Sequence, residues 1–563
     1  MLDRCFNRTV ADTPSPRSTR ASCAHWVGLL LVWGLAAGVS SPAAAQRFLP
    51  DDPLWSDPDR MDMPFPAPQP VETVQEGPVE LLRRLLAPPI ETPTPAANVN
   101  TVEGVPNSSW YTNRHYRSPR SDAALRRGPN TTPDPAQQGS WQVEQIHDSA
   151  LPRATIRDST GRRFQLLFDT ETYPELATGA AMVSSRLLHA LGYNVPHYWL
   201  HDLRRDRLAP SPNTPVTDAA IDSLLTHTLR TDSTYRALVS RIPDVERRIG
   251  PFSFRGRRVD DANDVFPHED RRELRSLRVV AAWLHHSMIR RRHTLDVGVQ
   301  EDGRRFVRHY LTNLHITLGS AGARPKPRWS GHKHVLEFDQ VLQRAATIGL
   351  SGAPWLETNV PHLPGLGHFG AIGFVPEEWR PEWPSPAFQR LAPADAFWAA
   401  KNIRHFSRSD LATIVETADY SSDATETYIV ETLRRRRDAI GRAYLSRGGG
   451  LGRFTVQGDT LRFRDLHAQY NDAPDSLRRT ITWHVFKNQS NELGRRLAQS
   501  TTRREAIPIP PSRARFLRVR LQSQSLGETR VFLRRTLPQT TLFPPMSMPY
   551  EVVGIKRRGE RGN

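Results

Sequence analysis

Residues 163–203 read RFQLLFDTETYPELATGAAMVSSRLLHALGYNVPHYWLHDL and carry the pattern on which the fold prediction depends. The segment opens with a short apolar run typical of a strand, and Tyr173-Pro174 then leads into a stretch of helical periodicity. The apolar positions that recur on one face of this stretch are Ala180, Val183, Leu187 and Leu191. Gly192 follows as a helix C-terminal residue, and 195–203 is again typical of a strand. We therefore expect a strand, a helix and a second strand in this order.

The chain on either side of this segment extends the pattern. Residues 154–168 predict a β-hairpin with a Thr160-Gly161 turn. Residues 268–288 predict the clearest helix of the protein, because apolar residues recur on one face. These residues are Leu274, Leu277, Ala281, Leu284 and Met288. A second hairpin is expected over 294–311, with its turn at Asp302-Gly303.

Two stretches of the central region lack sustained periodicity. Residues 210–265 are polar and rich in Pro and Asp, with one helical patch over 218–229 that Thr217 could cap, and we interpret them as an insertion. Residues 320–390 are rich in loops. Three further helices are predicted at 393–404, 409–417 and 423–445.

The two ends of the chain differ from this central part. Residues 46–100 are rich in proline and predict a tether or a segment that follows the surface, with one short helical stretch at 79–86. Glycines at 448–450 end the last helix, and 448–563 predicts a small, sandwich-like all-β domain. Its expected strands are 453–456, 480–486, 515–521, 529–534 and 550–555.

Composition restricts the classes of function. The 563 residues carry 76 Lys and Arg against 59 Asp and Glu, a net charge of +17 that makes the protein strongly basic. Only five of the basic residues are lysines, and none precedes Lys326, so lysine chemistry is excluded from more than half of the chain. The chain contains no G-x-S-x-G or H-E-x-x-H motif, which removes the common signals of hydrolases.

The N-terminal residues predict export. An apolar run at 26–39 follows four arginines and precedes the sequence SPAAAQ, which is the order of a signal peptide over residues 1–45. Cleavage between Ala45 and Gln46 would remove both cysteines, Cys5 and Cys23, and would leave no transmembrane span. A permanent anchor is the weaker alternative. We expect a location in the periplasm, at the cell surface or outside the cell, where nucleic acid is not a physiological partner.

Four segments carry a resemblance to known proteins: PELATGAAMVSSRLLHALGYNVP (174–196), LRVVAAWLHHSMIRRRHTLD (277–296), RRFVRHYLTNLHITLGS (304–320) and DAFWAAKNIRHFS (395–407). They resemble secreted bacterial proteins of largely unassigned role, which are similar to the atypical kinase superfamily of HipA-type and spore-coat-type kinases. The resemblance implies an α+β fold, with a two-lobed protein-kinase-like domain over 101–447 before the all-β domain.

The same resemblance assigns the positions at which a kinase would hold its charged groups. Leu167 stands where the phosphate-gripping lysine is expected, and Ala181 stands where its glutamate partner is expected. Met288 replaces the loop aspartate, and His293 replaces the asparagine five residues later. Asn313 replaces the metal-binding aspartate of the D-F-G-like turn. The resemblance therefore implies a pseudokinase without catalytic residues, and no cofactor is expected.

Other interpretations of these residues stay open. An atypical phosphotransferase could have rebuilt its site from His293, Asn313, Asp296 and arginines, using ATP with Mg²⁺ or Mn²⁺, and Asp296 and Asn313 could bind a cation weakly. Five histidines could in principle bind Zn²⁺ or Cu²⁺, but their spacing lacks a metal-binding pattern, so we expect no metal site. These histidines are His285, His286, His293, His309 and His315.

Three basic runs offer a further alternative, at 290–292, 434–437 and 556–558. Such runs usually form solvated faces, but they could contact an anionic polymer. The sequence thus predicts an exported, catalytically inactive kinase-like protein with a binding or scaffolding role at the cell envelope. Its partner would be an envelope protein or an anionic polymer.

Overall fold

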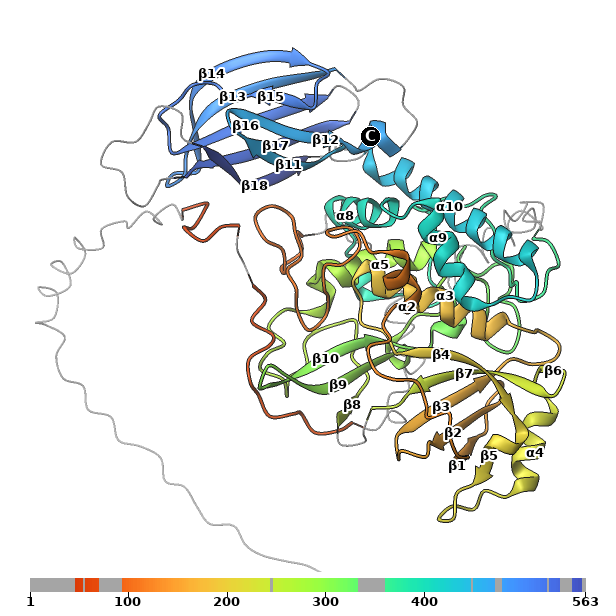
Figure 1. Cartoon of the computed structure of the whole chain (residues 1–563). Helices are drawn as coiled ribbons and strands as arrows, with labels where there is room; N and C mark the ends of the chain where they lie inside the picture. Colours follow the sequence, from red (N-terminus) through yellow and green to blue (C-terminus); the bar gives the residue numbers. More distant parts are fainter. Residues whose placement is uncertain are drawn as a thin grey trace, which may run out of the picture.

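The computed structural model describes residues 46–53, 56–69, 94–243, 247–332, 360–446, 449–470, 478–523, 526–536 and 549–558. The predicted signal peptide and the helical stretch at 79–86 lie outside these ranges. The fold is mixed α+β with several separate sheets, as Figure 1 shows. Among the described residues, no helix is both long enough and apolar enough to cross a membrane.

A seven-stranded sheet forms one end of the molecule. Its strands are β1 (Trp141–His147), β2 (Arg153–Arg157), β3 (Arg163–Phe168), β4 (Tyr198–Arg204), β5 (Leu208–Pro210), β6 (Arg230–Thr231) and β7 (Thr234–Arg241). The order is β4-β7-β3-β2-β1-β5, and β6 pairs with β7. β2 and β3 form the predicted hairpin, and α3 (Leu176–Leu191) packs against β3 and β4. The expected order of strand, helix and strand is therefore confirmed, and Gly192 ends the helix at a φ of 121°.

The region that we interpreted as an insertion contributes to this sheet. α4 (Asp218–Thr226) begins after Thr217, whose side chain accepts a hydrogen bond from the backbone N–H of Ala220. β7 follows and lies between β3 and β4, where its apolar residues are buried. β6 and β7 of this region are thus strands of the seven-stranded sheet, whereas β8 belongs to the sheet of β9 and β10.

A second group of elements packs against α3. It comprises α2 (Asp122–Arg127), α5 (Arg272–Trp283), α7 (Pro386–Gln389), α8 (Pro393–Arg404), α9 (Arg408–Val415), α10 (Asp423–Leu445) and the sheet of β8 (Arg248–Gly250), β9 (Thr294–Glu301) and β10 (Arg304–Leu311). The predicted ends of α8 and α10 are confirmed. α5 is shorter than the helix expected over 268–288, because the chain turns at His285, which has a φ of 52°.

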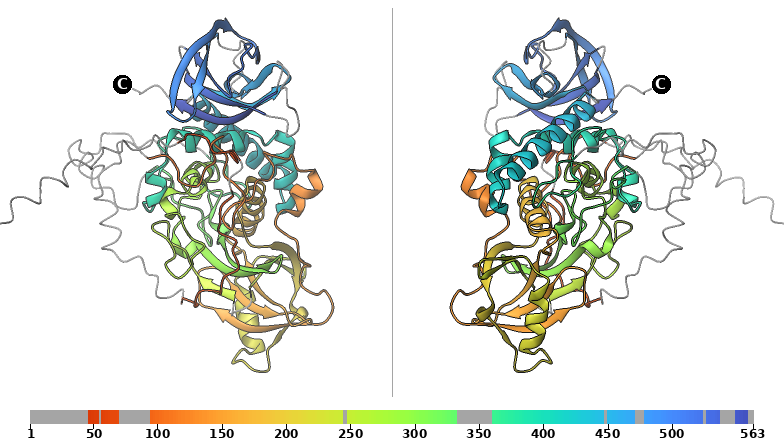
Figure 2. Two further views of the ribbon diagram at one scale, coloured as in Figure 1. Left: turned by 90° about the vertical axis from the view of Figure 1, so that its left-hand side faces the viewer. Right: turned by 90° about the vertical axis from the view of Figure 1, so that its right-hand side faces the viewer.

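The C-terminal β domain contains two sheets. One has the order β11-β12-β15 and the other the order β14-β13-β16-β17-β18. Their strands are β11 (Leu451–Gln457), β12 (Thr460–Asp465), β13 (Arg479–Lys487), β14 (Glu492–Thr502), β15 (Ala506–Pro508), β16 (Phe516–Ser523), β17 (Gly527–Arg535) and β18 (Tyr550–Arg558), and α11 (Leu466–Tyr470) follows β12. Leu461 of the first sheet and Val519 of the second belong to one buried apolar cluster. Both views in Figure 2 place this domain at the end of the molecule opposite β1–β3.

The N-terminal residues that the structure describes lie on the folded body. Phe48 is 2% exposed and packs among three phenylalanines of the C-terminal domain, Phe486, Phe516 and Phe532. Residues 56–69 then run along β8–β10, where the backbone N–H of Met63 donates to Arg305 and that of Gln69 to Ile249. Of the two interpretations of this segment, these residues therefore follow the surface.

Candidate functional site

The structure brings two of the kinase-equivalent residues into one apolar cluster. Leu167 lies on β3, and Ala181 lies on α3; both side chains are buried. A lysine and a glutamate at these positions would form the ion pair that grips a nucleotide phosphate. Two apolar side chains cannot supply this charge, and instead they stabilise the contact between the sheet and the helix.

The other kinase-equivalent residues follow α5 and β10. Met288 is half-buried in a turn, and His293 is buried at the end of a short 3₁₀ helix before β9. Asn313 begins the 3₁₀ helix Leu314–Ile316 with a left-handed φ of 56°. The described side chains at these three positions carry no carboxylate, which Mg²⁺ binding normally requires.

Three buried imidazoles lie near these positions. His286 and His293 stack with their ring centroids 6.4 Å apart, and the charge of His315 would oppose protonation of both. Burial lowers the pKa of His286 and His293 well below the usual imidazole value, and it lowers the pKa of His315 to about 3. The cluster is therefore neutral at physiological pH and cannot balance the charge of a phosphate.

The tip of the hairpin formed by β1 and β2 lies beside the same region. Leu151 is buried, and its side chain and the ring of His315 both lie beside Gly322. Arg153 lies on β2 directly opposite Leu167 of β3, and its Nη2 is 3.2 Å from Nε2 of His315. Arg153 was not predicted as a site residue, although the register of the predicted hairpin alone places it opposite Leu167.

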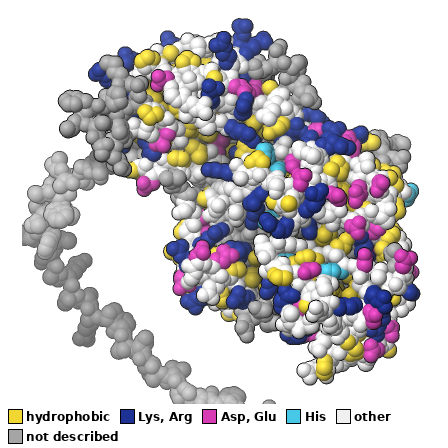
Figure 3. Space-filling view, viewed as in Figure 1, with side chains coloured by type: hydrophobic (Ala, Val, Ile, Leu, Met, Phe, Trp, Pro, Cys, Tyr) yellow, Lys and Arg dark blue, Asp and Glu magenta, His cyan; other side chains and the backbone are white. Residues whose placement is uncertain are grey.

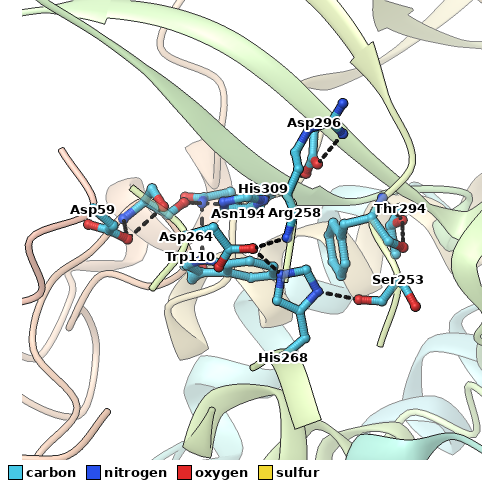
Figure 4. Close-up of polar contacts among 12 residues, drawn as sticks. Asp59, Trp110, Asn194, Ser253, Arg258, Asp264, His268, Thr294, Asp296 and His309 are labelled. Atoms are coloured by element: carbon cyan, nitrogen blue, oxygen red, sulfur yellow. Dashed lines mark hydrogen bonds and ion pairs between the residues drawn. The ribbon is translucent and has the colours of Figure 1, made fainter. Parts of the chain in front are cut away.

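Asp296 does not join this group. It is buried on β9, where its carboxylate contacts His309 Nδ1 at 2.7 Å and Arg258 Nη1 at 3.2 Å (Figure 4). The ring of His309 stacks on Trp110 with centroids 3.5 Å apart. Arg258 and His309 thus engage the carboxylate of Asp296, and the weak cation site considered for Asp296 and Asn313 stays a prediction.

A second aspartate–histidine pair lies in the same network. His268 Nε2 is 2.6 Å from Asp264, and His268 Nδ1 contacts the backbone carbonyl of Ser253 (Figure 4). A catalytic triad would require a hydroxyl or thiol nucleophile at that nitrogen. The network is also closed to solvent, because both histidines are buried. Its role is to join β9 and β10 to the segment before α5.

Lys326 is a buried residue that the sequence analysis did not single out as a candidate. Its Nζ donates a hydrogen bond of 2.6 Å to the backbone carbonyl of His285, and burial lowers its pKa to about 7. A cavity of about 610 Å³ lies beside it, between residues 172–176, 324–328 and 360–368. The described lining includes Arg324 and Arg328 but no Asp or Glu, so the cavity favours a neutral or anionic ligand.

The basic runs have different surroundings. In the run on α10, Arg434 pairs with Glu431 and Asp438 at 2.8 and 2.9 Å, and Arg436 is buried against backbone carbonyls. That run is therefore engaged within the protein. Lys556, in contrast, is exposed on β18.

Within the described residues, no group of three or more His, Cys, Asp or Glu side chains is arranged to hold a metal ion. Comparison of the chain with family models, with curated proteins and with solved structures finds no match.

Proposed function

We propose that this protein is an exported, catalytically inactive kinase-like protein that binds a partner at the cell envelope. The observation that carries the proposal is the set of side chains at the kinase-equivalent positions. Leu167 and Ala181 are apolar and buried, and the imidazole of His293 is neutral. A phosphotransferase needs charged groups at these positions to hold the phosphates and the metal ion.

The hairpin tip supports the same proposal. Leu151 and Arg153 contact the His315 region across the space that a nucleotide would need between hairpin and loop. The rebuilt phosphotransferase is less well supported, since the carboxylate of Asp296 is held by Arg258 and His309. The predicted signal peptide supports export, and the absence of cysteine after Ala45 agrees with it.

Nucleotide binding is the experiment that tests inactivity. The chain from Gln46 to Asn563 is unfolded thermally with ATP or GTP, each with Mg²⁺, Mn²⁺ or a chelator. A ligand at 100 times its Kd stabilises the folded state by about 2.7 kcal/mol, which shifts the Tm measurably. We expect no metal-dependent shift, and no transfer of labelled phosphate to the protein itself or to an added acceptor protein.

Arg153 provides the matched variant for this experiment. If ATP raised the Tm of the wild type but not that of Arg153→Met, the space beneath the hairpin would bind nucleotide and the inactive-cleft proposal would be wrong. Arg157→Met, on the same strand at a partly exposed ion pair with Glu144, serves as the control.

A further inference from the structure

The positive charge of the chain is concentrated in its C-terminal β domain. Residues 449–563 contain 21 Arg and Lys and nine Asp and Glu, so that this fifth of the chain carries +12 of the net charge of +17. Figure 3 shows Lys and Arg side chains over this domain, at the top of the view. A field of one sign on one domain attracts partners of opposite charge.

The register of the five-stranded sheet places many of these cations on one face. Val519 and Val531 point into the core shared with the other sheet, and alternate residues therefore point outward. One outward row across the strands contains Arg520, Arg530 and Lys556. The neighbouring row contains Arg496, His484 and Arg518. We call the outward surface formed by Arg496, Arg518, Arg520, Arg530 and Lys556 the basic face.

The basic face holds more positive charge than the protein neutralises. Directly opposed like charges destabilise a sheet. Glu528 forms ion pairs with both Arg520 and Arg530, and its Oε2 lies 2.5 Å from Nε of Arg520. Nε of Arg518 has no hydrogen-bond partner among the described residues, and three arginines, Arg530, Arg520 and Arg47, lie near it against one carboxylate, that of Glu528. The basic face therefore carries an excess of positive charge that suits an external anion.

Exposed leucines flank the basic face. Leu493 lies on β14 opposite Phe486, which belongs to the outward side, and is 45% exposed. Leu49 is 60% exposed and follows Phe48, which packs on Phe486, Phe516 and Phe532 on the outward side of the sheet. Arg47 lies over the ring of Phe532 at 4.5 Å and so borders the basic face. The outward side thus combines cations with accessible apolar groups.

We propose that the basic face lies against a membrane surface that contains anionic phospholipids, with the guanidinium groups on headgroup phosphates and the two leucines at the acyl boundary. The arrangement is that of peripheral membrane proteins, in which cations and exposed apolar residues act together. A soluble anionic polymer would use the cations but would leave Leu49 and Leu493 without a role. The proposal rests on the proposed export, since a location at the cell envelope would place the basic face beside a membrane.

Vesicle binding tests the proposal with the chain from Gln46 to Asn563. Vesicles of phosphatidylcholine with about 30% phosphatidylglycerol are compared with pure phosphatidylcholine by co-sedimentation at about 0.1 M salt. We expect binding to the anionic vesicles only. Arg496→Glu combined with Lys556→Glu should weaken it by about 30-fold or more, because each surface cation contributes about fivefold to the affinity. The matched control, Arg462→Glu with Arg504→Glu, makes the same charge change at exposed positions of the domain outside the basic face and should retain most of the binding.

The leucines distinguish a membrane from a polymer. Leu49→Ser with Leu493→Ser should weaken binding to anionic vesicles by at least about tenfold, whereas Val259→Ser, at a position 99% exposed, should not change it. Each variant is accepted only if its Tm matches that of the wild type. Equal binding to both kinds of vesicle, or binding to soluble polyphosphate without binding to anionic vesicles, would overturn the proposal. These outcomes are independent of nucleotide binding, and a failure here leaves the proposed inactivity untouched.

Discussion

The docking of the chain on its own C-terminal domain depends on Phe48, and Phe48→Ala is the sharpest test of this part of the structure. The ring is 2% exposed and lies 5.2 Å from Phe532, 6.1 Å from Phe486 and 6.2 Å from Phe516, measured between centroids. Replacing a buried Phe by Ala costs about 3–5 kcal/mol. We expect the segment 46–53 to detach without unfolding the domain, so that the loss is limited to the free energy of docking.

Hydrogen exchange measures that loss directly. The backbone N–H of Phe48 donates to Asn488 Oδ1 at 2.9 Å and is protected only while the segment is docked. A loss of about 3 kcal/mol raises the population of the detached state, and hence the exchange rate at Phe48, by about 100-fold. Leu49→Ala is the matched control, since Leu49 is 60% exposed and should alter the rate by less than about threefold. Unchanged exchange in Phe48→Ala would refute the reasoning that the aromatic cluster holds the segment.

Two further changes test buried charges. Arg271→Met should lower the free energy of unfolding by about 3–5 kcal/mol in a denaturant titration, because Arg271 is fully buried and balances three buried carboxylates. Arg305→Met is the control: Arg305 forms an exposed ion pair, and its loss should cost less than about 1 kcal/mol. Equal losses in the two variants would contradict this prediction. Burial lowers the pKa of Lys326 and of Lys401 to about 7, below the value of 10.5 in the unfolded chain. Between about pH 7 and pH 10 the folded state therefore binds fewer protons than the unfolded state, and the free energy of unfolding should rise with pH over this range. Lys326→Met should remove about half of this rise in Tm, and an unchanged pH profile would show that Lys326 is not buried as described.

The elements that could be predicted are those whose patterns are local. The helices at 393–404 and 423–445 have the predicted ends, and a helix lies between them as predicted. Helical periodicity and caps involve residues within one or two turns, so they can be read directly. Three strands of the C-terminal domain were missed. β14 is an edge strand with mostly exposed residues, and β15 has only three residues. β12 was also missed, although its buried and exposed residues alternate.

The candidate site could be predicted only in part. The residue types at Leu167, Ala181 and Met288 already indicated a site without charge. The hairpin predicted over 294–311 already places Asp296 opposite His309. The ion pair of Asp296 with Arg258 could not be foreseen, since Arg258 is 38 residues away and lies outside any regular element. The contact between Arg153 and His315 spans 162 residues. Such contacts depend on how the hairpin, the loop after β10 and the helices pack together.

By itself, the sequence determined the types of many elements, their order and the apolar character of Leu167 and Ala181, because each of these depends on residue identity and on spacing over a few residues. Only the tertiary structure decided which charges are neutralised and which stay available. Arg271 and Arg518 are both arginines without any distinguishing local pattern. The fold buries the first among carboxylates brought from distant segments, and it leaves the second on an outward row of cations. Charge balance is a sum over neighbours in space, and this sum exists only once the chain has folded.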